Sequence, residues 1–315
     1  MALLAVDTER LWDQVLQFIE EGRVIPVVGP ELLTLETGGR TAHLYGYLAE
    51  RLAKQLRITW NSGDTTLNTV VCRYLAERGE IEDIYPALKR VMPPSDELSL
   101  PTALIMLAEI RPLKLFVSTS FDPLLVQALN RVRYGGQDKT QILAFSPNST
   151  QDLPREVEKL DLATVFHLFG RLSSIPDYAV TDEDLLEFIH ALQSKTGRPE
   201  RLFDAMVGSH LLIIGCAFSD WFARFLVRIG RHERLSMARG KTDVLVDERA
   251  QQDDELVHFL QHFSTRTKVF PGGAVAFVNE LHSRWIAAHP RGARNRYHSN
   301  PLLARLMTWN AARSS

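Results

Sequence analysis

The chain has 315 residues, of which 45% are hydrophobic and 23% charged, and its formal net charge at pH 7 is −2. This composition is that of a globular protein with a sizeable core, and the small net charge excludes a global field that would draw the molecule to nucleic acid or an anionic membrane. No apolar run approaches the roughly 20 residues of a membrane span. Because Asp7, Glu9 and Asp13 stand where a signal peptide would be basic, we expect a cytoplasmic protein with no membrane partner.

Metal and disulfide chemistry find little support in the sequence. There are two cysteines, Cys72 and Cys216, and both lie within apolar patterns, so we expect reduced and packed thiols. Two thiols cannot build a four-thiolate zinc site, and the histidines have no spacing that would replace the missing ligands. We therefore predict that the protein binds no metal.

The predicted elements alternate between helices and short strands. A helix at residues 8–21 precedes a strand at 23–28, and a helical insertion at about 41–95 follows. Apolar runs without alternation predict buried strands, and the remaining segments have helical spacing. The further strands are 115–117, 141–145, 163–168, 211–214, 244–246 and 267–270; the further helices are 101–110, 124–132, 181–193, 199–207, one from 219, 256–263 and 274–288.

This order predicts an α/β fold, a Rossmann-like, doubly wound and mainly parallel sheet with helical insertions. We expect residues 1–290 to form one domain. The insertion at 41–95 forms either a lid or an oligomer surface, and the sequence does not choose between them.

The predicted strands end in turns at the edge of the sheet where such folds bind ligands. The first turn, Gly29-Pro30-Glu31, stands where nucleotide-binding folds place their phosphate loop. Pro30 lacks an N–H group and Glu31 adds a negative charge, so this turn is a poor cradle for an anion. After the 115–117 strand, Asp122 is a predicted helix N-cap and Pro123 the first helical residue.

Residues 291–315 differ from the rest of the chain, with five arginines and no acidic residue. The spacing of Leu302, Leu303, Leu306 and Met307 predicts a short helix with one apolar side. We expect this tail to dock either on a partner effector or neighbouring subunit, or on its own domain. Its arginines permit nucleic-acid contact, which we expect to be indirect at most.

The turns together resemble those of the sirtuin-like superfamily, specifically its zinc-free branch in bacterial anti-phage defence. That family has a glycine-alanine-glycine loop where this chain has Val28-Gly29-Pro30-Glu31. Its Thr-Thr-Asn-Phe-Asp pattern corresponds to Ser118-Thr119-Ser120-Phe121-Asp122, its His-Leu-His-Gly to Phe166-His167-Leu168-Phe169-Gly170, and its Gly-Tyr-Ser-Phe-Ser-Asp to Ile214-Gly215-Cys216-Ala217-Phe218-Ser219-Asp220. The resemblance covers roughly residues 10–288.

The resemblance implies a fold that binds NAD and, in intact members, hydrolyses NAD+ to nicotinamide and ADP-ribose. Catalysis in the family depends on the asparagine of the second motif and the histidine of the third. Here His167 remains, whereas Ser120 replaces the asparagine and lacks its paired donor and acceptor. For NAD or an ADP-ribose-type nucleotide, the resemblance implies contacts with Gly29, Pro30, Glu31, Thr119, Asp122, Gly215, Phe218, Asp220 and Asp247.

Each of these residues also has a structural interpretation. His167 fits a hydrogen-bonded core histidine, and Ser120 fits a turn residue. The glycines fit tight turns and the aspartates fit helix caps. Glu31 fits a solvated loop charge that could also occupy the place of a phosphate.

Two hypotheses follow from the altered motifs. The first is a catalytically impaired sirtuin-like subunit of an anti-phage system, forming a homo-oligomer and acting as a nucleotide sensor or as an assembly scaffold for a partner effector. The resemblance implies an effector of the Toll/interleukin-receptor (TIR) type, since related regions lie beside such a domain. The second is an NAD+ glycohydrolase that depletes NAD+ on infection, with His167 and Ser120 as its catalytic residues. Protein deacetylation is a distant third.

Overall fold

The computed structural model describes residues 8–37, 40–59, 66–94, 98–155, 160–194, 197–216, 225, 228, 241–246, 254–264, 267–270 and 272–290. The predictions for Phe218, Asp220, Asp247, the helix from residue 219 and the 291–315 tail lie outside these residues.

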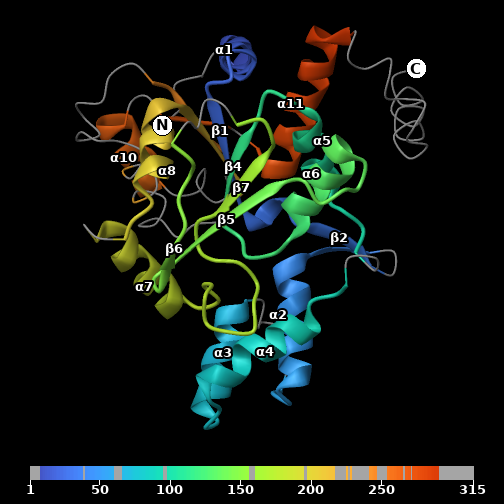
Figure 1. The fold of residues 1–315 in the computed structure, drawn as a ribbon, viewed down its shortest axis with the longest axis vertical. Helices are drawn as coiled ribbons and strands as arrows, with labels where there is room; N and C mark the ends of the chain where they lie inside the picture. Colours follow the sequence, from blue (N-terminus) through green and yellow to red (C-terminus); the bar gives the residue numbers. More distant parts are fainter. Residues whose placement is uncertain are drawn as a thin grey trace.

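A twisted sheet of eight strands forms the centre of the described chain (Figure 1), in the order β10-β9-β8-β1-β4-β7-β5-β6. Neighbouring strands are parallel except for the antiparallel pair β5 and β6. This confirms the predicted Rossmann-like α/β fold. The strands are β1 (Val24–Val28), β4 (Leu115–Ser118), β5 (Gln141–Ser146), β6 (Ser149–Thr150), β7 (Thr164–His167), β8 (His210–Ile214), β9 (Asp243–Val246) and β10 (Thr267–Val269).

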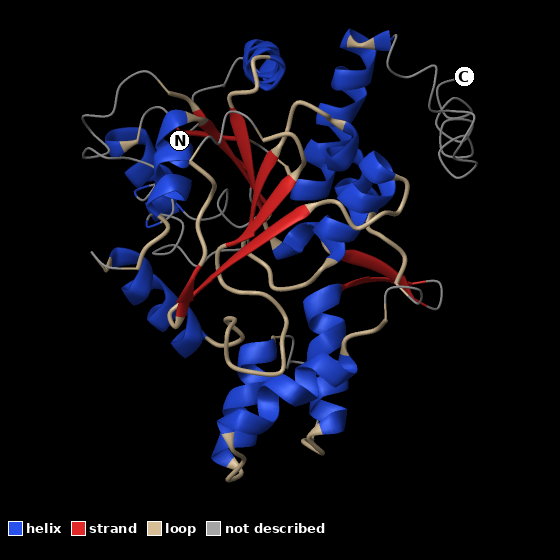
Figure 2. Ribbon diagram, viewed as in Figure 1, coloured by secondary structure: helices blue, strands red, loops and turns tan. Residues whose placement is uncertain are grey.

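Helices cover both faces of the sheet (Figure 2). Alternate residues of β1 contact opposite layers: Val24 and Val28 belong to one hydrophobic cluster, Ile25 and Val27 to the other. Burial of both faces explains why these strands are continuous apolar runs. The first layer contains α1 (Thr8–Glu20), α5 (Thr102–Glu109), α6 (Leu124–Tyr134) and α11 (Ala274–Ala288); the second contains α7 (Asp182–Gln193), α8 (Glu200–Gly208) and α10 (Asp254–Phe263).

The predicted helical insertion forms a lobe of three helices that projects beyond the sheet (Figure 1). Its helices are α2 (Leu44–Gln55), α3 (Leu67–Ala76) and α4 (Ile81–Val91), and both α3 and α4 pack on α2. Below, "the lobe" means these three helices. Its buried residues join the same hydrophobic cluster as α5, α6 and α11, so the core is continuous from the sheet into the lobe.

A two-stranded hairpin before the lobe was not predicted. It consists of β2 (Thr34–Thr37) and β3 (Arg40–His43), which are antiparallel. Between them the sequence reads Gly38-Gly39, a dipeptide that favours a two-residue hairpin turn. That signal was present, but the flanking residues form no continuous apolar run, which is the pattern by which the other strands were recognised.

The two thiols differ in exposure. Cys216 is buried, as predicted, but the prediction of a packed thiol at Cys72 is wrong, because this residue is exposed on α3. The buried side of α3 is formed by Leu67, Val70 and Val71. Each residue turns the helix by about 100°, so the residue after Val71 points away from that side.

Among the described helices, none is long and apolar enough to cross a membrane.

Candidate site at the carboxyl edge of the sheet

Four strands end side by side at one edge of the sheet, and their turns form the candidate site. β1 lies between β4 and β8, and the chain reaches β8 only after β4, β5 and β7 have been placed on the other side. The end of β1 is therefore the topological switch point, where open α/β sheets bind ligands.

Backbone hydrogen bonds bring these turns together. The N–H of Thr119 donates to Val28 (3.0 Å), and the N–H of Leu168 donates to Ser118 (2.9 Å). The structure thus places all the predicted site residues that it describes at one edge; these are Gly29, Pro30, Glu31, Thr119, Ser120, Asp122, His167 and Gly215.

The first turn has no free N–H group to offer an anion. Gly29 donates to the carbonyl of Ile214 (2.9 Å), and Glu31 donates to the carbonyl of Gly215 (3.0 Å). Pro30 has no N–H, and the next amide, that of Leu32, donates back to Gly29 (3.3 Å). A phosphate loop works because its amides point at the ligand. Here they are occupied by the neighbouring β8 turn and by a single turn of 3₁₀-helix, residues Pro30–Leu32.

Gly29 is required by its close approach to the β8 turn. Its φ of −115° is accessible to any residue, but an added Cβ would lie 2.2 Å from the Cα of Cys216 and 2.3 Å from the carbonyl oxygen of Gly215. Gly215 itself adopts φ +61°, in the left-handed region that favours glycine. The tight-turn interpretation therefore describes Gly215, whereas Gly29 allows two backbone segments to touch.

Glu31 lies against the β8 turn and the start of α11. A Cβ built on Gly215 would be 2.8 Å from the Cβ of Glu31, 3.3 Å from its Oε2 atom and 2.7 Å from the Cβ of Ala274. Ala274 is the first residue of α11, and Glu31 is half-buried. A carboxylate beside a helix N-terminus stands where an anion is favoured. With its amides occupied and a negative charge present, the first turn does not fit a diphosphate in this conformation.

The second turn is held by its own hydroxyl groups. The Oγ atoms of Ser118 and Ser120 lie 3.0 Å apart, and the Ser118 Oγ accepts from the N–H of Ser120 (3.2 Å). Thr119, which is half-buried, donates from Oγ1 to the carbonyl of Val28 (3.3 Å). The Ser120 side chain is therefore engaged within the turn, in keeping with the turn-residue interpretation.

Asp122 was predicted to be the N-cap of α6 but lies one residue before the N-cap. It still forms a hydrogen bond with the start of the helix. Its Oδ1 accepts from the N–H of Leu124 (2.9 Å), and the N-cap residue is Pro123, so the prediction that Pro123 is the first helical residue is wrong. Asp122 is fully buried, and burial raises the pKa of its carboxyl, an effect that a hydrogen bond from Ser120 partly offsets. Within the described residues its Oδ2 atom has no hydrogen-bond partner.

His167 is a core histidine. It is the last residue of β7, its side chain is 0% exposed, and its Nδ1 lies 2.9 Å from the carbonyl oxygen of Ser120. Nδ1–H therefore donates to that carbonyl, and Nε2 is left without a partner among the described residues. Burial lowers the pKa of His167 to about 4, so the ring is neutral at pH 7.

Two tyrosines that the sequence did not single out close over this edge. Tyr45 of α2 accepts at Oη from the N–H of Phe121 (3.1 Å), and its ring stacks on the Phe121 ring at 4.8 Å. Tyr178 is fully buried 5.0 Å from the Phe121 ring, and its hydroxyl has no partner within the described chain. Helical periodicity predicted that the insertion had a buried side, but it could not indicate which turn that side would meet.

This geometry positions no exposed nucleophile or base among the described site residues. Ser120 is 5% exposed and His167 is fully buried, so neither side chain reaches a substrate unless the residues that cover it move. Groups of three or more side chains that could hold a metal ion are likewise absent from the described residues.

Part of the chain, including three of the turns at this edge, is similar to a known family of protein domains. A family model described as "SIR2-like domain" matches residues 114–267. The match includes the turns after β4, β7 and β8, but it begins at Lys114 and so excludes the turn at residues 29–31. The search of curated proteins finds no match. Residues 114–267 are therefore similar to a SIR2-like domain.

Proposed function

We propose that this protein is a catalytically impaired sirtuin-like subunit, which acts as a nucleotide sensor or an assembly scaffold for a partner effector in bacterial anti-phage defence. The observation that carries the proposal is the burial of His167, whose Nδ1 is committed to the Ser120 carbonyl. A general base must come within hydrogen-bond reach of the proton it removes, and a fully buried ring does not.

Two further observations support impairment. Ser120, which replaces the family's asparagine, is nearly buried and bonded to Ser118, so it does not hold a water for reaction. The amides of residues 29–31 are occupied, and Glu31 adds a negative charge beside the β8 turn. A dinucleotide diphosphate would have to displace these contacts in order to bind.

The partner and the oligomer remain part of the proposal. We expect the protein to assemble with copies of itself and with an effector of the TIR type, docked through the basic tail at residues 291–315. The tail's five arginines favour a partner surface that is acidic around an apolar centre.

The alternative is an NAD+ glycohydrolase. One observation favours it: among the residues that the structure describes, the buried edge leaves polar atoms of Asp122, His167 and Tyr178 without partners, as a site would if it opened to receive a polar ligand. Nicotinamide release separates the two functions.

In the experiment, purified protein is incubated with millimolar NAD+, and nicotinamide is quantified by chromatography. We expect no turnover by the wild type. A thermal shift with NAD+ or ADP-ribose would then identify a sensor, and no shift would identify a scaffold. Turnover by the wild type that is lost in His167→Asn, and retained in the surface control His190→Asn, would overturn the proposal in favour of the enzyme.

A further inference from the structure

A chain of four aromatic rings runs from the lobe across the candidate site. Tyr45 of α2 stacks on Phe121 at 4.8 Å, Phe121 contacts Tyr178 at 5.0 Å, and Tyr178 meets Tyr85 of α4 edge to face at 5.3 Å. Tyr85 is 2% exposed and Tyr178 0%. The lobe is therefore seated on the β4 turn and on the segment that follows β7.

Hydrogen bonds from α3 and from Tyr85 of α4 connect the lobe to the first turn of α7. The Tyr85 hydroxyl donates to Oδ1 of Asp184 (2.8 Å). Asn68 of α3 donates to Oδ2 of Asp182 (3.1 Å) and accepts from the N–H of the same residue (3.1 Å). These contacts join residues that are 99 and 114 positions apart in the sequence.

Asp184 links this contact to the fold of α7. Its Oδ2 accepts from the N–H groups of Thr181 (2.8 Å) and Val180 (2.9 Å), which completes the capping box of α7. One carboxylate thus holds the start of α7 with one oxygen and the lobe with the other. A movement of the lobe away from Tyr178 must break the bond to Tyr85 but leaves the cap in place.

Three buried polar atoms at this edge of the sheet have no hydrogen-bond partner within the described part of the chain. Asp122 Oδ2, His167 Nε2 and the Tyr178 hydroxyl are buried and lack partners among the described residues. Buried polar groups are rarely left in this state, because each loses its bonds to water without gaining others. Opening of the edge would let these atoms bind water or a polar ligand, which favours a second, open state.

We propose that the lobe is a lid over the carboxyl edge of β4 and β7, and that the hydrogen bond between Tyr85 and Asp184 is its latch. The lid controls access to the Ser120–Asp122 turn and to His167, and α2, α3 and α4 move together because they pack on one another. The role of the lid in nucleotide entry rests on the proposed nucleotide-sensing function.

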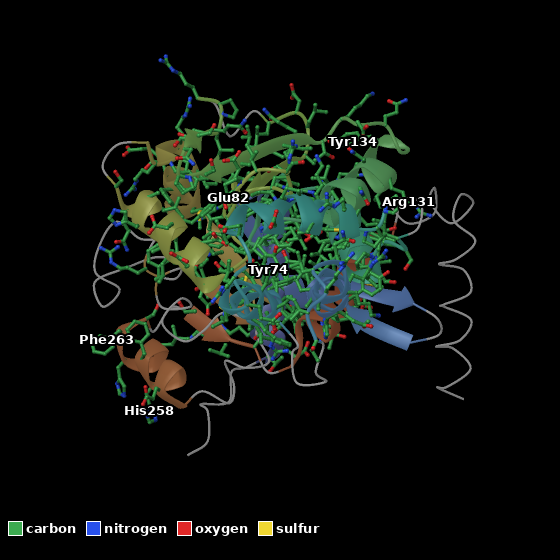
Figure 3. The ribbon with its side chains drawn as sticks, turned by 90° about the horizontal axis from the view of Figure 1, so that it is seen from below. Tyr74, Glu82, Arg131, Tyr134, His258 and Phe263 are labelled. Carbon is green, nitrogen blue, oxygen red and sulfur yellow. The ribbon has the colours of Figure 1, made fainter. Side chains whose placement is uncertain are left out.

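The test compares two tyrosine-to-phenylalanine variants by hydrogen–deuterium exchange of the full chain. Tyr85→Phe removes the latch hydroxyl and keeps the ring against Tyr178. Tyr74→Phe is the matched control: its hydroxyl also donates to an aspartate, Asp83, at 2.7 Å, but this bond joins α3 to α4 inside the lobe. Tyr74, which Figure 3 labels, is half-buried on α3.

With the latch removed, we expect amides of residues 118–122 to exchange roughly tenfold faster, the factor expected for losing a hydrogen bond to a charged group. Tyr74→Phe should leave them at the wild-type rate, and β8 amides, as an internal reference, should be unchanged in both variants. Equal rates at residues 118–122 in Tyr85→Phe and wild type would overturn the lid, as would a uniform increase that includes β8.

NAD+ or ADP-ribose added to the same samples separates the lid from the proposed function. Faster exchange in Tyr85→Phe without any thermal shift by either nucleotide supports the lid and refutes nucleotide sensing. A thermal shift with unchanged exchange supports sensing and refutes the lid. Faster exchange together with a faster onset of nucleotide binding in Tyr85→Phe supports both.

Discussion

The backbone N–H of Glu31 donates a hydrogen bond to the carbonyl oxygen of Gly215 at 3.0 Å, and this contact joins the β1 turn to the β8 turn. It fills the switch point of the sheet with protein backbone. In a nucleotide-binding fold the same amide would face a phosphate. The contact depends on Gly29, which lets the two turns approach.

Replacement of Gly29 by alanine should be severely destabilising. The new Cβ would meet backbone atoms of Gly215 and Cys216 at 2.2 to 2.6 Å, and backbone cannot move aside as a flexible side chain can. We expect a loss of at least about 3 kcal/mol in the free energy of unfolding, measured by urea denaturation. Gly208→Ala is the control, since nothing lies within 4 Å of its added Cβ. A Gly29→Ala protein as stable as that control would contradict the close approach.

The stability of the protein should fall as the pH is lowered from 6.5 to 4, in part because of His167. The unfolded histidine takes up a proton below its ordinary pKa of 6.5, whereas burial holds the folded pKa at about 4. In this window the unfolded state binds more protons, so stability decreases with decreasing pH, by up to about 3 kcal/mol for this residue.

His167→Asn should flatten this pH dependence. The asparagine amide can still donate toward the Ser120 carbonyl but does not titrate. The free energy of unfolding is measured at pH 7.5, 6 and 5 for wild type, His167→Asn and the exposed control His190→Asn. Identical slopes for all three proteins would show that His167 titrates normally and is not buried as described.

Arg133 should be a major contributor to stability through hydrogen bonds to backbone carbonyls. Its guanidinium donates to three backbone carbonyls at the end of α5 and in the loop before β4: Ala108 (2.7 Å), Ile110 (2.9 Å) and Leu113 (2.7 Å). Burial lowers the pKa of Arg133 to about 10, so it stays charged at pH 7.

Arg133→Gln removes these three hydrogen bonds to backbone carbonyls, and we expect a destabilisation of about 2 to 4 kcal/mol in urea denaturation. Arg131→Gln, on the exposed side of the same helix, should change the stability by less than about 0.5 kcal/mol (Figure 3). Equal effects of the two substitutions would refute the role given to the three carbonyls.

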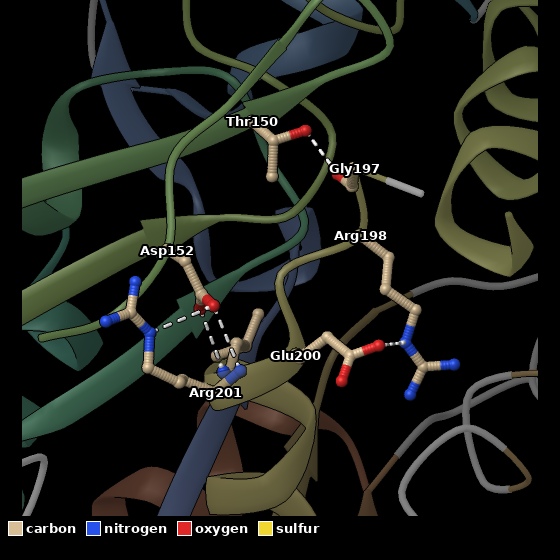
Figure 4. Close-up of polar contacts among 7 residues, drawn as sticks. Thr150, Asp152, Gly197, Arg198, Glu200 and Arg201 are labelled. Atoms are coloured by element: carbon tan, nitrogen blue, oxygen red, sulfur yellow. Dashed lines mark hydrogen bonds and ion pairs between the residues drawn. The ribbon is translucent and has the colours of Figure 1, made fainter. Parts of the chain in front are cut away.

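Asp152 should be the cap of α8 across a gap of 50 residues. The N-cap position holds Pro199, which has no capping side chain, and Asp152 accepts instead from the N–H groups of Arg201 (3.0 Å) and Leu202 (3.1 Å) (Figure 4). Asp152→Ala should cost about 1 to 2 kcal/mol in thermal or urea unfolding. The neighbouring ion pair of Glu200 and Arg198 is long, at 3.8 Å, and Glu200→Ala should have little effect. A larger loss in Glu200→Ala would refute this assignment.

The sequence by itself determined the class of fold and placed the candidate site at one edge of the sheet. Apolar runs without alternation marked strands buried on both faces, and β1, β4, β7 and β8 lie where those runs predicted them. The carboxyl ends of parallel strands share one edge, so the turns could be placed together before any contact was known.

Tertiary structure alone decided which residues those turns contact. The amide of Glu31 is occupied by Gly215, His167 is bonded to Ser120, and Tyr45 covers Phe121. These contacts join residues that are 47 to 184 positions apart. Periodicity reports only which side of an element is apolar, since it arises from the local geometry of helix and strand. Which group that side meets, and whether a polar atom is thereby paired or left without a partner, depends on how distant segments pack.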